Sequence, residues 1–162
     1  MEYRTDNLIL RPVTEEDLAE VARTWPSGHH PLSDEETRAE ITRMQQTHSR
    51  NTAGRLHHLC LAVFDKNDPR TIRGWVGLDG RRNPSEPEIF VLLQDKDLRG
   101  KGNGTQCMKA LLRIAAEEYA LSVVHGGCHK ENTASARAME KAGMILCGHD
   151  EDGGLRYMYK KS

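Results

Sequence analysis

Three glycines alternate with polar residues in the segment Arg99–Thr105, which reads Arg-Gly-Lys-Gly-Asn-Gly-Thr. The segment lies between a predicted strand, Glu88–Leu93, and the clearest helical pattern of the chain, in which apolar side chains recur at spacings of three and four up to Tyr119. Glycine permits tight turns, and the first N–H groups of a helix have no partner within it. The segment therefore predicts a helix start that binds an anion such as a pyrophosphate.

The side chains of this segment support the same interpretation, because Arg99 and Lys101 add positive charge and Thr105 adds a hydroxyl. Two nucleotide-binding motifs do not fit. A P-loop needs a lysine after its second glycine, where this chain has Thr105, and a dinucleotide fingerprint needs a third glycine where the chain has Thr105 or Cys107. A structural role, in which the glycines only turn a strand into a helix, stays open.

The remaining sequence predicts strands and helices in a mixed order. Strands are expected at Leu8–Val13, Leu59–Phe64, Thr71–Leu78 and Leu121–Cys128, and in a hairpin of Met144–Cys147 and Leu155–Tyr159. Helices are expected after the cap residues Thr14 and Ser33 and over Thr133–Lys141, which ends at Gly143. Consecutive strands predict an antiparallel meander, whereas a helix between two strands predicts a parallel crossover. We expect one α/β (α+β) domain over residues 1–162.

Composition excludes several classes of protein. The chain is 37% apolar and 29% charged, with a net charge of −1, so it is not expected to be disordered, to span a membrane or to bind nucleic acid. Its first residues include Glu2, Arg4 and Asp6 and no long apolar run, so neither an export signal nor an anchor is predicted and a cytoplasmic location is expected.

Cysteines and histidines do not form a metal-binding pattern. The four cysteines contain no C-x-x-C pair and fall in apolar stretches, which favours reduced and mostly buried thiols. The pairs His29–His30 and His57–His58 are adjacent, so their side chains would point to opposite sides of a strand. His125 and His129 lie in a strand-to-loop stretch where a spacing of four does not bring side chains together. No metal site is predicted.

Two spaced motifs resemble those of the GCN5-related N-acetyltransferases, abbreviated GNAT. Arg99-x-x-Gly102-x-Gly104 fits the Q/R-x-x-G-x-G/A signature of that family. Asn132-Thr133-Ala134-Ser135, followed by Met139 to Met144, resembles its N-x-x-S/A element leading into E-K-x-G-F. Leu8 to Pro12 with Asp17 looks like the opening of the ribosomal-protein-alanine acetyltransferase branch. The order of predicted elements is also that of the family, over essentially the whole chain.

This resemblance implies a fold and an acetyl donor. The fold is a twisted, mostly antiparallel sheet of about seven strands with a central, splayed parallel pair and about four helices. The donor is acetyl-CoA, whose pantetheine arm would pair with backbone groups of Leu92, Leu93 and Gln94 and would be flanked by Asn132 and Ser135. The remaining implied contacts are Arg99, Gly100, Lys101, Gly102, Asn103, Gly104 and Thr105 in the glycine segment, and Met139 and Lys141 in the following helix.

The resemblance also implies transfer of the acetyl group to a primary amine by direct attack. A base must remove the ammonium proton first, because only the neutral amine has a free lone pair. Glu88 lies eleven residues before Arg99, where the histone-modifying branch carries its catalytic glutamate. It is the candidate general base, although a role as a solvated residue beside Glu86 stays open. The oxyanion would be stabilised by a backbone N–H around Leu92 or Leu93.

Several features of the reaction stay undetermined. The family's usual proton donor to the leaving thiolate is a tyrosine, and the matching position here is Met139. Weaker candidates for that donor are Tyr157, Tyr159, Cys128 and His129. A catalytically silent, CoA-binding regulatory module is therefore the alternative function. The acceptor is a small amine, an amino acid or a protein N-terminus, entering between the loop Trp25–Leu32 and the acidic turn Asp150–Gly154, and a homodimer is possible.

Overall fold

The computed structural model describes residues 1–26 and 31–161, and in these ranges it contains one eight-stranded sheet and four α-helices. The strands are β1 (Tyr3–Arg4), β2 (Leu8–Arg11), β3 (His58–Asp65), β4 (Gly74–Asp79), β5 (Glu88–Leu93), β6 (Val123–Cys128), β7 (Ile145–His149) and β8 (Leu155–Lys160). The helices are α1 (Leu18–Thr24), α2 (Asp34–Ser49), α3 (Asn103–Glu117) and α4 (Thr133–Lys141), with short 3-10 turns at Glu15–Asp17 and Lys96–Leu98.

The sheet has the mixed topology that the sequence predicts. Its order is β1-β2-β3-β4-β5-β6-β8-β7, and every neighbouring pair is antiparallel except the central pair β5 and β6. Strand β1 is additional to the predicted seven, because two residues are too short to show a periodic pattern. Helix α3 connects β5 to β6, which gives the expected parallel crossover.

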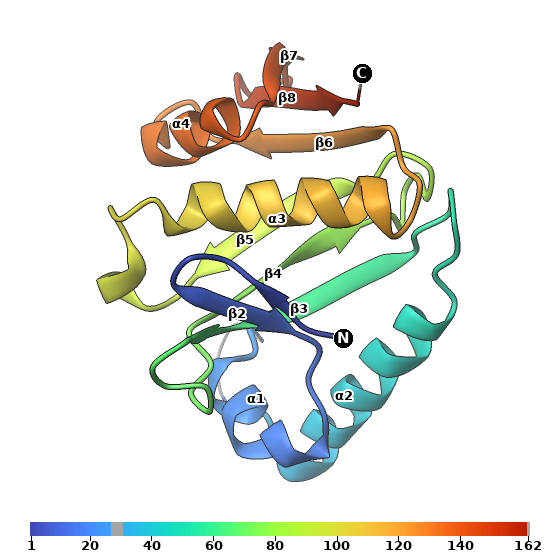
Figure 1. Cartoon of the computed structure of the whole chain (residues 1–162), viewed down its shortest axis with the longest axis vertical. Helices are drawn as coiled ribbons and strands as arrows, with labels where there is room; N and C mark the ends of the chain where they lie inside the picture. Colours follow the sequence, from blue (N-terminus) through green and yellow to red (C-terminus); the bar gives the residue numbers. More distant parts are fainter. Residues whose placement is uncertain (27–30, 162) are drawn as a thin grey trace.

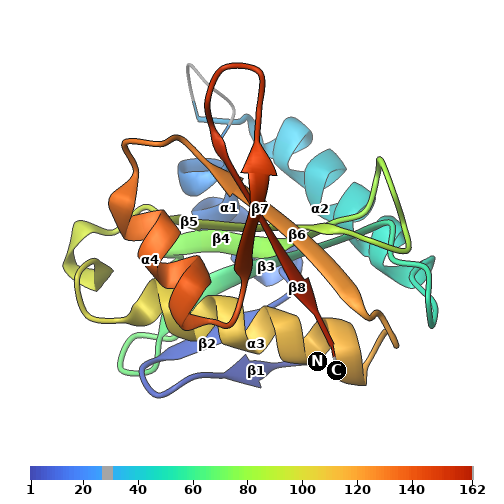
Figure 2. The same ribbon diagram turned by 90° about the horizontal axis from the view of Figure 1, so that it is seen from above.

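Helices cover both faces of the sheet. Figures 1 and 2 show α1 and α2 on one side and α3, with α4 beside it, on the other. The alternation of side chains along β3 divides the core accordingly, since Leu59 and Leu61 face the α3 layer and Cys60 and Ala62 face α1 and α2. The side chains of β5 divide in the same way, so Glu88, Phe90 and Leu92 lie on the α1–α2 face.

Most predicted boundaries agree with the structure. Capping boxes at Thr14 and Ser33 precede the first two helices, and Gly143 has a left-handed φ of 103° after α4. Strand β6 begins at Val123 rather than at Leu121, because the N–H of Leu121 still bonds to the Ala115 carbonyl of α3, at 2.9 Å.

The cysteines are less buried than the sequence predicts. Cys60 and Cys107 are buried, but Cys128 is only partly buried and Cys147 is exposed on β7. Strand β7 forms one edge of the sheet, and most of its residues, Cys147 among them, are exposed. Residues 29 and 30 lie outside the described part of the chain, and the other residues contain no group of three or more metal-ligating side chains. None of the described helices is both long and apolar enough to cross a membrane.

An ion pair between Arg11 and Asp17 fixes the start of α1 against β2. The guanidinium donates to both carboxylate oxygens, at 2.8 and 2.9 Å, and the Thr14 N–H donates to the same carboxylate at 2.9 Å. Burial of Asp17 raises its pKa, but these hydrogen bonds outweigh that effect and hold the pKa below its ordinary value. The ionised carboxylate is therefore bound more strongly in the folded state than in the unfolded chain.

We expect Asp17→Asn to lower the free energy of unfolding by about 2 kcal/mol at pH 7, because it removes the charge from this network. Since the folded-state pKa of Asp17 is depressed, its contribution is present above about pH 4 and is lost as the pH falls further. Urea unfolding at pH 7 and pH 2.5 should show the difference from wild type shrinking at the lower pH. Glu16→Gln, at an exposed neighbour, is the matched control and should change little.

Candidate functional site

Strands β5 and β6 pair at one position and then separate. Glu88 is opposite His125, and the His125 N–H donates to the Pro87 carbonyl at 2.9 Å. Strand β5 nevertheless remains paired with β4 along its whole length, up to Leu93 opposite Gly74. A gap therefore opens between β5 and β6 beyond Glu88, which is the splayed pair that the sequence resemblance implies.

The ladder between β4 and β5 determines which backbone groups face this gap. The N–H of Gln94 donates to the carbonyl of Arg73, the residue just before β4, at 2.9 Å. Backbone groups alternate in direction along an antiparallel strand, so the main chain at Leu92 also faces β4. The main chain at Val91 and Leu93 faces the gap, and the Leu93 carbonyl accepts a hydrogen bond from the Arg99 guanidinium at 3.1 Å.

The glycine segment turns from β5 into the start of α3. Gly100 and Gly102 have left-handed φ values of 73° and 79°, which side chains with a Cβ rarely adopt. Asn103 is buried and closes the turn, because its amide nitrogen donates to the Leu98 carbonyl at 3.0 Å. Its side chain thus has a structural role. The first hydrogen bond of the helix runs from the Gln106 N–H to the Gly102 carbonyl. The N–H groups of residues 103–105 therefore have no acceptor within the helix.

Gly104 is not explained by internal packing. Its φ lies outside the left-handed region, and a Cβ built at this position would contact no atom within 4 Å. The space in front of the helix start is thus open, with Arg99 and Lys101 exposed beside it and Thr105 in the first turn. This arrangement fits an anionic group bound by backbone N–H groups and the helix dipole.

Helix α4 lies beside the gap, and the residues predicted to contact CoA there have different environments. The Asn132 side chain caps the helix by accepting from the Ser135 N–H at 3.0 Å, so both residues lie at the helix start. Lys141 is exposed at the opposite end of the helix. Met139 is only 2% exposed and packs beneath β6, where a Cβ on Gly126 would lie 3.0 Å from its sulfur. The structure therefore places Met139 in the core.

Glu88 lies where the gap begins and forms an ion pair with Arg156 of β8. Arg156 Nη1 donates to Glu88 Oε1 at 2.6 Å, and the Glu88 side chain is 41% exposed. The guanidinium crosses β6 above Gly127, where any Cβ would overlap it. Sequence reasoning missed Arg156, although Gly126-Gly127 within a predicted strand was a signal of close approach.

A cavity of about 420 Å³ extends from Glu88 across the α1–α2 face of the sheet. Aromatic side chains form much of its wall, with Trp25 and Trp75 in edge-to-face contact at 5.0 Å and His58 stacked on Phe90 at 5.8 Å. Gly127 lines the cavity across the gap from Glu88. The cavity therefore reaches the place where β5 and β6 separate.

Polar groups in this cavity are paired with one another. Arg81 donates to Asp79 at 3.0 and 2.6 Å, and this pair lowers the pKa of Asp79 to about 2. Burial lowers the pKa of His58, although the nearby Asp79 opposes that effect. Burial raises the pKa of the Cys60 thiol to about 12, so this cysteine is not a thiolate at neutral pH.

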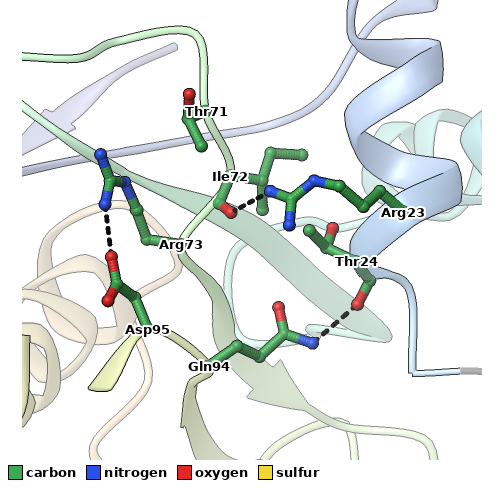
Figure 3. A pocket seen from close by; sticks show the side chains of 7 residues that line it. All are labelled: Arg23, Thr24, Thr71, Ile72, Arg73, Gln94 and Asp95. Carbon is green, nitrogen blue, oxygen red and sulfur yellow. Dashed lines mark hydrogen bonds and ion pairs between the residues drawn. The ribbon is translucent and has the colours of Figure 1, made fainter. Parts of the chain in front are cut away.

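A second cavity, of about 330 Å³, lies at the far end of β5 (Figure 3). The Gln94 amide donates to the Thr24 carbonyl at 2.7 Å, and the Arg23 guanidinium donates to the Ile72 carbonyl at 3.1 Å. The arginines are neutralised, because Arg73 is paired with Asp95 and Asp68, and Arg23 with Glu20. These contacts hold the end of α1 against β4 and β5.

In the acidic turn after β7, Asp150 has a structural role. Asp150 closes the turn by donating its N–H to the Gly154 carbonyl at 2.8 Å, and its carboxylate lies 3.8 Å from Arg156 Nε.

Tyr157, a candidate proton donor, is only 2% exposed and its hydroxyl donates to Glu140 at 2.9 Å. Burial and Glu140 raise the pKa of Tyr157 to about 12.

Solved structures with similar folds are acetyltransferases. The ribosomal-protein-S5-alanine acetyltransferase of Vibrio fischeri superposes with a TM-score of 0.81 and 15% identity, covering 100% of this chain and 97% of that one. RimL, a ribosomal L7/L12 α-N-protein acetyltransferase in complex with CoA, gives 0.74 and 17%, with coverage of 99% and 98%. The microcin C7 self-immunity acetyltransferase MccE, in complex with acetyl-CoA and AMP, gives 0.69 and 15%, with coverage of 96% and 93%.

The family is shown by sequence. No curated protein matches the chain at a significant level. The family model described as an acetyltransferase (GNAT) domain matches residues 7–145, which include the gap, the glycine segment and α4. The chain thus belongs to the GNAT family of acetyltransferases.

Proposed function

We propose that this protein transfers an acetyl group from acetyl-CoA to a primary amine by direct attack, with Glu88 as the general base. The observation that carries this proposal is the meeting of two spaces at Glu88. The gap between β5 and β6 leads from the glycine segment to Glu88, and the cavity on the α1–α2 face begins there, with Gly127 opposite. A donor in the gap and an acceptor in the cavity would thus meet beside one carboxylate.

The residues around the gap suit CoA. The backbone groups of Val91 and the N–H of Leu93 can pair with the amides of the pantetheine arm, because they have no strand partner on the β6 side. Leu92 and Gln94, which the sequence resemblance implied as contacts, direct their backbone groups toward β4 instead. The open helix start at Gly104, with Arg99 and Lys101, suits the pyrophosphate. Structures of similar fold contain CoA or acetyl-CoA, which supports the same donor here.

The proposed chemistry needs no covalent enzyme intermediate. Glu88 takes a proton from the acceptor ammonium, and the neutral nitrogen forms a bond to the acetyl carbonyl carbon. The carbon–sulfur bond then breaks, and the nitrogen gives up its second proton to solvent to become the amide. Cys60, the cysteine in the cavity wall, is held as a neutral thiol and is a poor nucleophile, which favours direct attack. Arg156 holds the Glu88 carboxylate in place through a hydrogen bond of 2.6 Å.

Solvent is the proposed proton source for the leaving thiolate. Met139 is buried beneath β6 and has no proton to donate, and the Tyr157 hydroxyl is occupied by Glu140 in the core. A thiol has a pKa of about 8.5, so the thiolate leaves readily and can be protonated by water. The buried methionine is therefore compatible with turnover.

Glu88→Gln should lower turnover on the order of 100-fold, because the amide cannot accept the ammonium proton. Acetyl-CoA affinity should stay nearly unchanged, since Glu88 lies on the acceptor side of the gap. Thiol release measured across an amine panel gives the first quantity, and calorimetry with acetyl-CoA gives the second. Glu86→Gln is the matched control, and wild-type turnover in Glu88→Gln would remove Glu88 from the mechanism.

The same measurements distinguish the alternative function. A catalytically silent module would bind acetyl-CoA in calorimetry and release no thiol with any amine of the panel. An acetyltransferase would do both. Failure to bind acetyl-CoA would contradict both candidates.

Arg156→Met should lower kcat/KM by about tenfold, because the Glu88 side chain loses the guanidinium that positions it beside the cavity. Arg156→Lys retains a cation at this place and should lower kcat/KM less. Acetyl-CoA affinity, measured in parallel, should be retained in both variants. An unchanged kcat/KM in Arg156→Met would show that this ion pair does not position the base.

Gly104→Asp should weaken acetyl-CoA binding by about tenfold or more, because a carboxylate in the first turn repels a bound pyrophosphate. The same carboxylate favours the positive end of α3, so the melting temperature should not fall. Gly104→Ala adds only a methyl group in open space and is the uncharged control. Unchanged affinity in Gly104→Asp, measured by calorimetry, would place the phosphates elsewhere.

A further inference from the structure

The wall of the cavity beside Glu88 is apolar over most of its surface. Trp25, Trp75, Phe90 and Ile89 line it, and Leu92 closes its wall near the gap. Leu92 is 42% exposed, and few large apolar side chains in the described chain are exposed to that degree. An apolar ligand would cover this surface and gain the free energy of burying it.

The cations at the cavity are already neutralised. Arg81 makes two hydrogen bonds to Asp79, and Arg156 makes a bond of 2.6 Å to Glu88. Among the described residues around this cavity, neither guanidinium is left without a carboxylate partner. A free carboxylate on the acceptor would therefore enter an apolar site without a cation to bind it, which is unfavourable.

The carboxylates are committed to the same pairs. Asp79 is bound by Arg81, and Glu88, which must take the proton of the reacting amine, is bound by Arg156. A second ammonium on the acceptor would thus find no unpaired carboxylate among the described cavity residues. Both amino acids and polyamines are poorly matched to these charges.

His58 adds to the apolar wall rather than to the charge of the cavity. Its ring stacks on Phe90 with an angle of 12° between the planes, and its Nδ1 is buried 3.6 Å from Asp79 Oδ1, beyond hydrogen-bond distance. The charged or titratable groups around it are Asp79 at the end of β4, Arg81 just after that strand, and Arg43 and His48 of α2. Burial favours the neutral imidazole, so the ring behaves as an aromatic surface.

We propose that the acceptor is a primary monoamine attached to an apolar, ring-sized group, with no second charge near the amine. A cavity of about 420 Å³ has the size of a small-molecule site. The apolar group would lie against Trp25, Phe90 and Leu92, and the amine would point toward Glu88. This inference rests on the proposed acetyltransferase activity and specifies its substrate class.

Three matched amines, assayed with the protein and acetyl-CoA, test whether a second charge near the amine is excluded. 2-Phenylethylamine has no second charge, phenylalanine adds a carboxylate to it, and phenylalaninamide adds a neutral amide. We expect kcat/KM for phenylalanine to be on the order of 100-fold below that for 2-phenylethylamine, because the carboxylate stays unpaired. Phenylalaninamide should stay within about tenfold of 2-phenylethylamine, since it adds no full charge. Spermidine, the polyamine arm, should be a poor acceptor.

Each outcome has a distinct meaning. Preference for phenylalanine or spermidine would overturn the substrate class while leaving the acetyltransferase activity established. Preference for a peptide with an N-terminal phenylalanine over both uncharged amines would overturn the small-molecule source and assign the cavity to a protein N-terminus. Binding of acetyl-CoA with no turnover of any amine would instead overturn the proposed function.

Two variants change the charge pairing in opposite directions. Asp79→Asn leaves Arg81 unpaired, so it should raise kcat/KM for phenylalanine relative to 2-phenylethylamine by about tenfold. Arg81→Gln leaves Asp79 unpaired, so it should instead improve spermidine relative to 2-phenylethylamine. Melting temperature and acetyl-CoA affinity report whether each variant is folded. Identical amine preferences in both variants and wild type would show that this pair does not select the acceptor.

Discussion

Hydrogen bonding between β5 and β6 ends after Glu88 and His125, and the site depends on that ending. Strand β4 holds β5 along its full length, so β5 cannot follow β6 as the two diverge. The gap that results runs toward the start of α3, because α3 is the crossover between the same two strands. One interruption in the sheet thus leaves an unpaired backbone edge on β5 between the cavity beside Glu88 and the start of α3.

Paired charges distinguish the proposed acceptor side, which is the cavity beside Glu88, from the proposed donor side at the start of α3. On the acceptor side Glu88, Asp79, Arg81 and Arg156 form two ion pairs around an apolar wall. Beside the start of α3, by contrast, Arg99 and Lys101 are exposed and the first turn contains no acidic residue. The donor side therefore favours a highly anionic ligand, whereas the acceptor side favours a ligand with little charge beyond the reacting amine.

Local patterns predicted much of the fold. The expected ends of β5 and α4 agree with the structure, because a bounded apolar run and a capped amphipathic segment are local signals. The two-residue strand β1 gave no such signal, and Cys147 was misjudged because an edge position depends on strand order rather than on local polarity. The order β6-β8-β7 depends on how the strands pair across the whole sheet, so no local pattern predicts it.

The site was predicted only in part, for the same reason. The glycine segment and Glu88 belong to continuous motifs, so their positions beside the gap follow from β5 and α3. Arg156 lies 68 residues after Glu88, and its contact depends on β8 pairing with β6 and on the absence of a side chain at Gly127. The burial of Met139 likewise depends on packing beneath β6, which no spacing in the sequence specifies.

The alternation of backbone direction along β5 has a consequence for solvent exchange. Amide hydrogens at Leu92 and Gln94 face β4, whereas those at Val91 and Leu93 face the gap. Neighbouring residues in the middle of the sheet should therefore exchange with deuterium at very different rates, even though they belong to the same strand. Occupation of the gap would slow only the faster set, so the labelling pattern of this short strand would reveal whether the donor is in place.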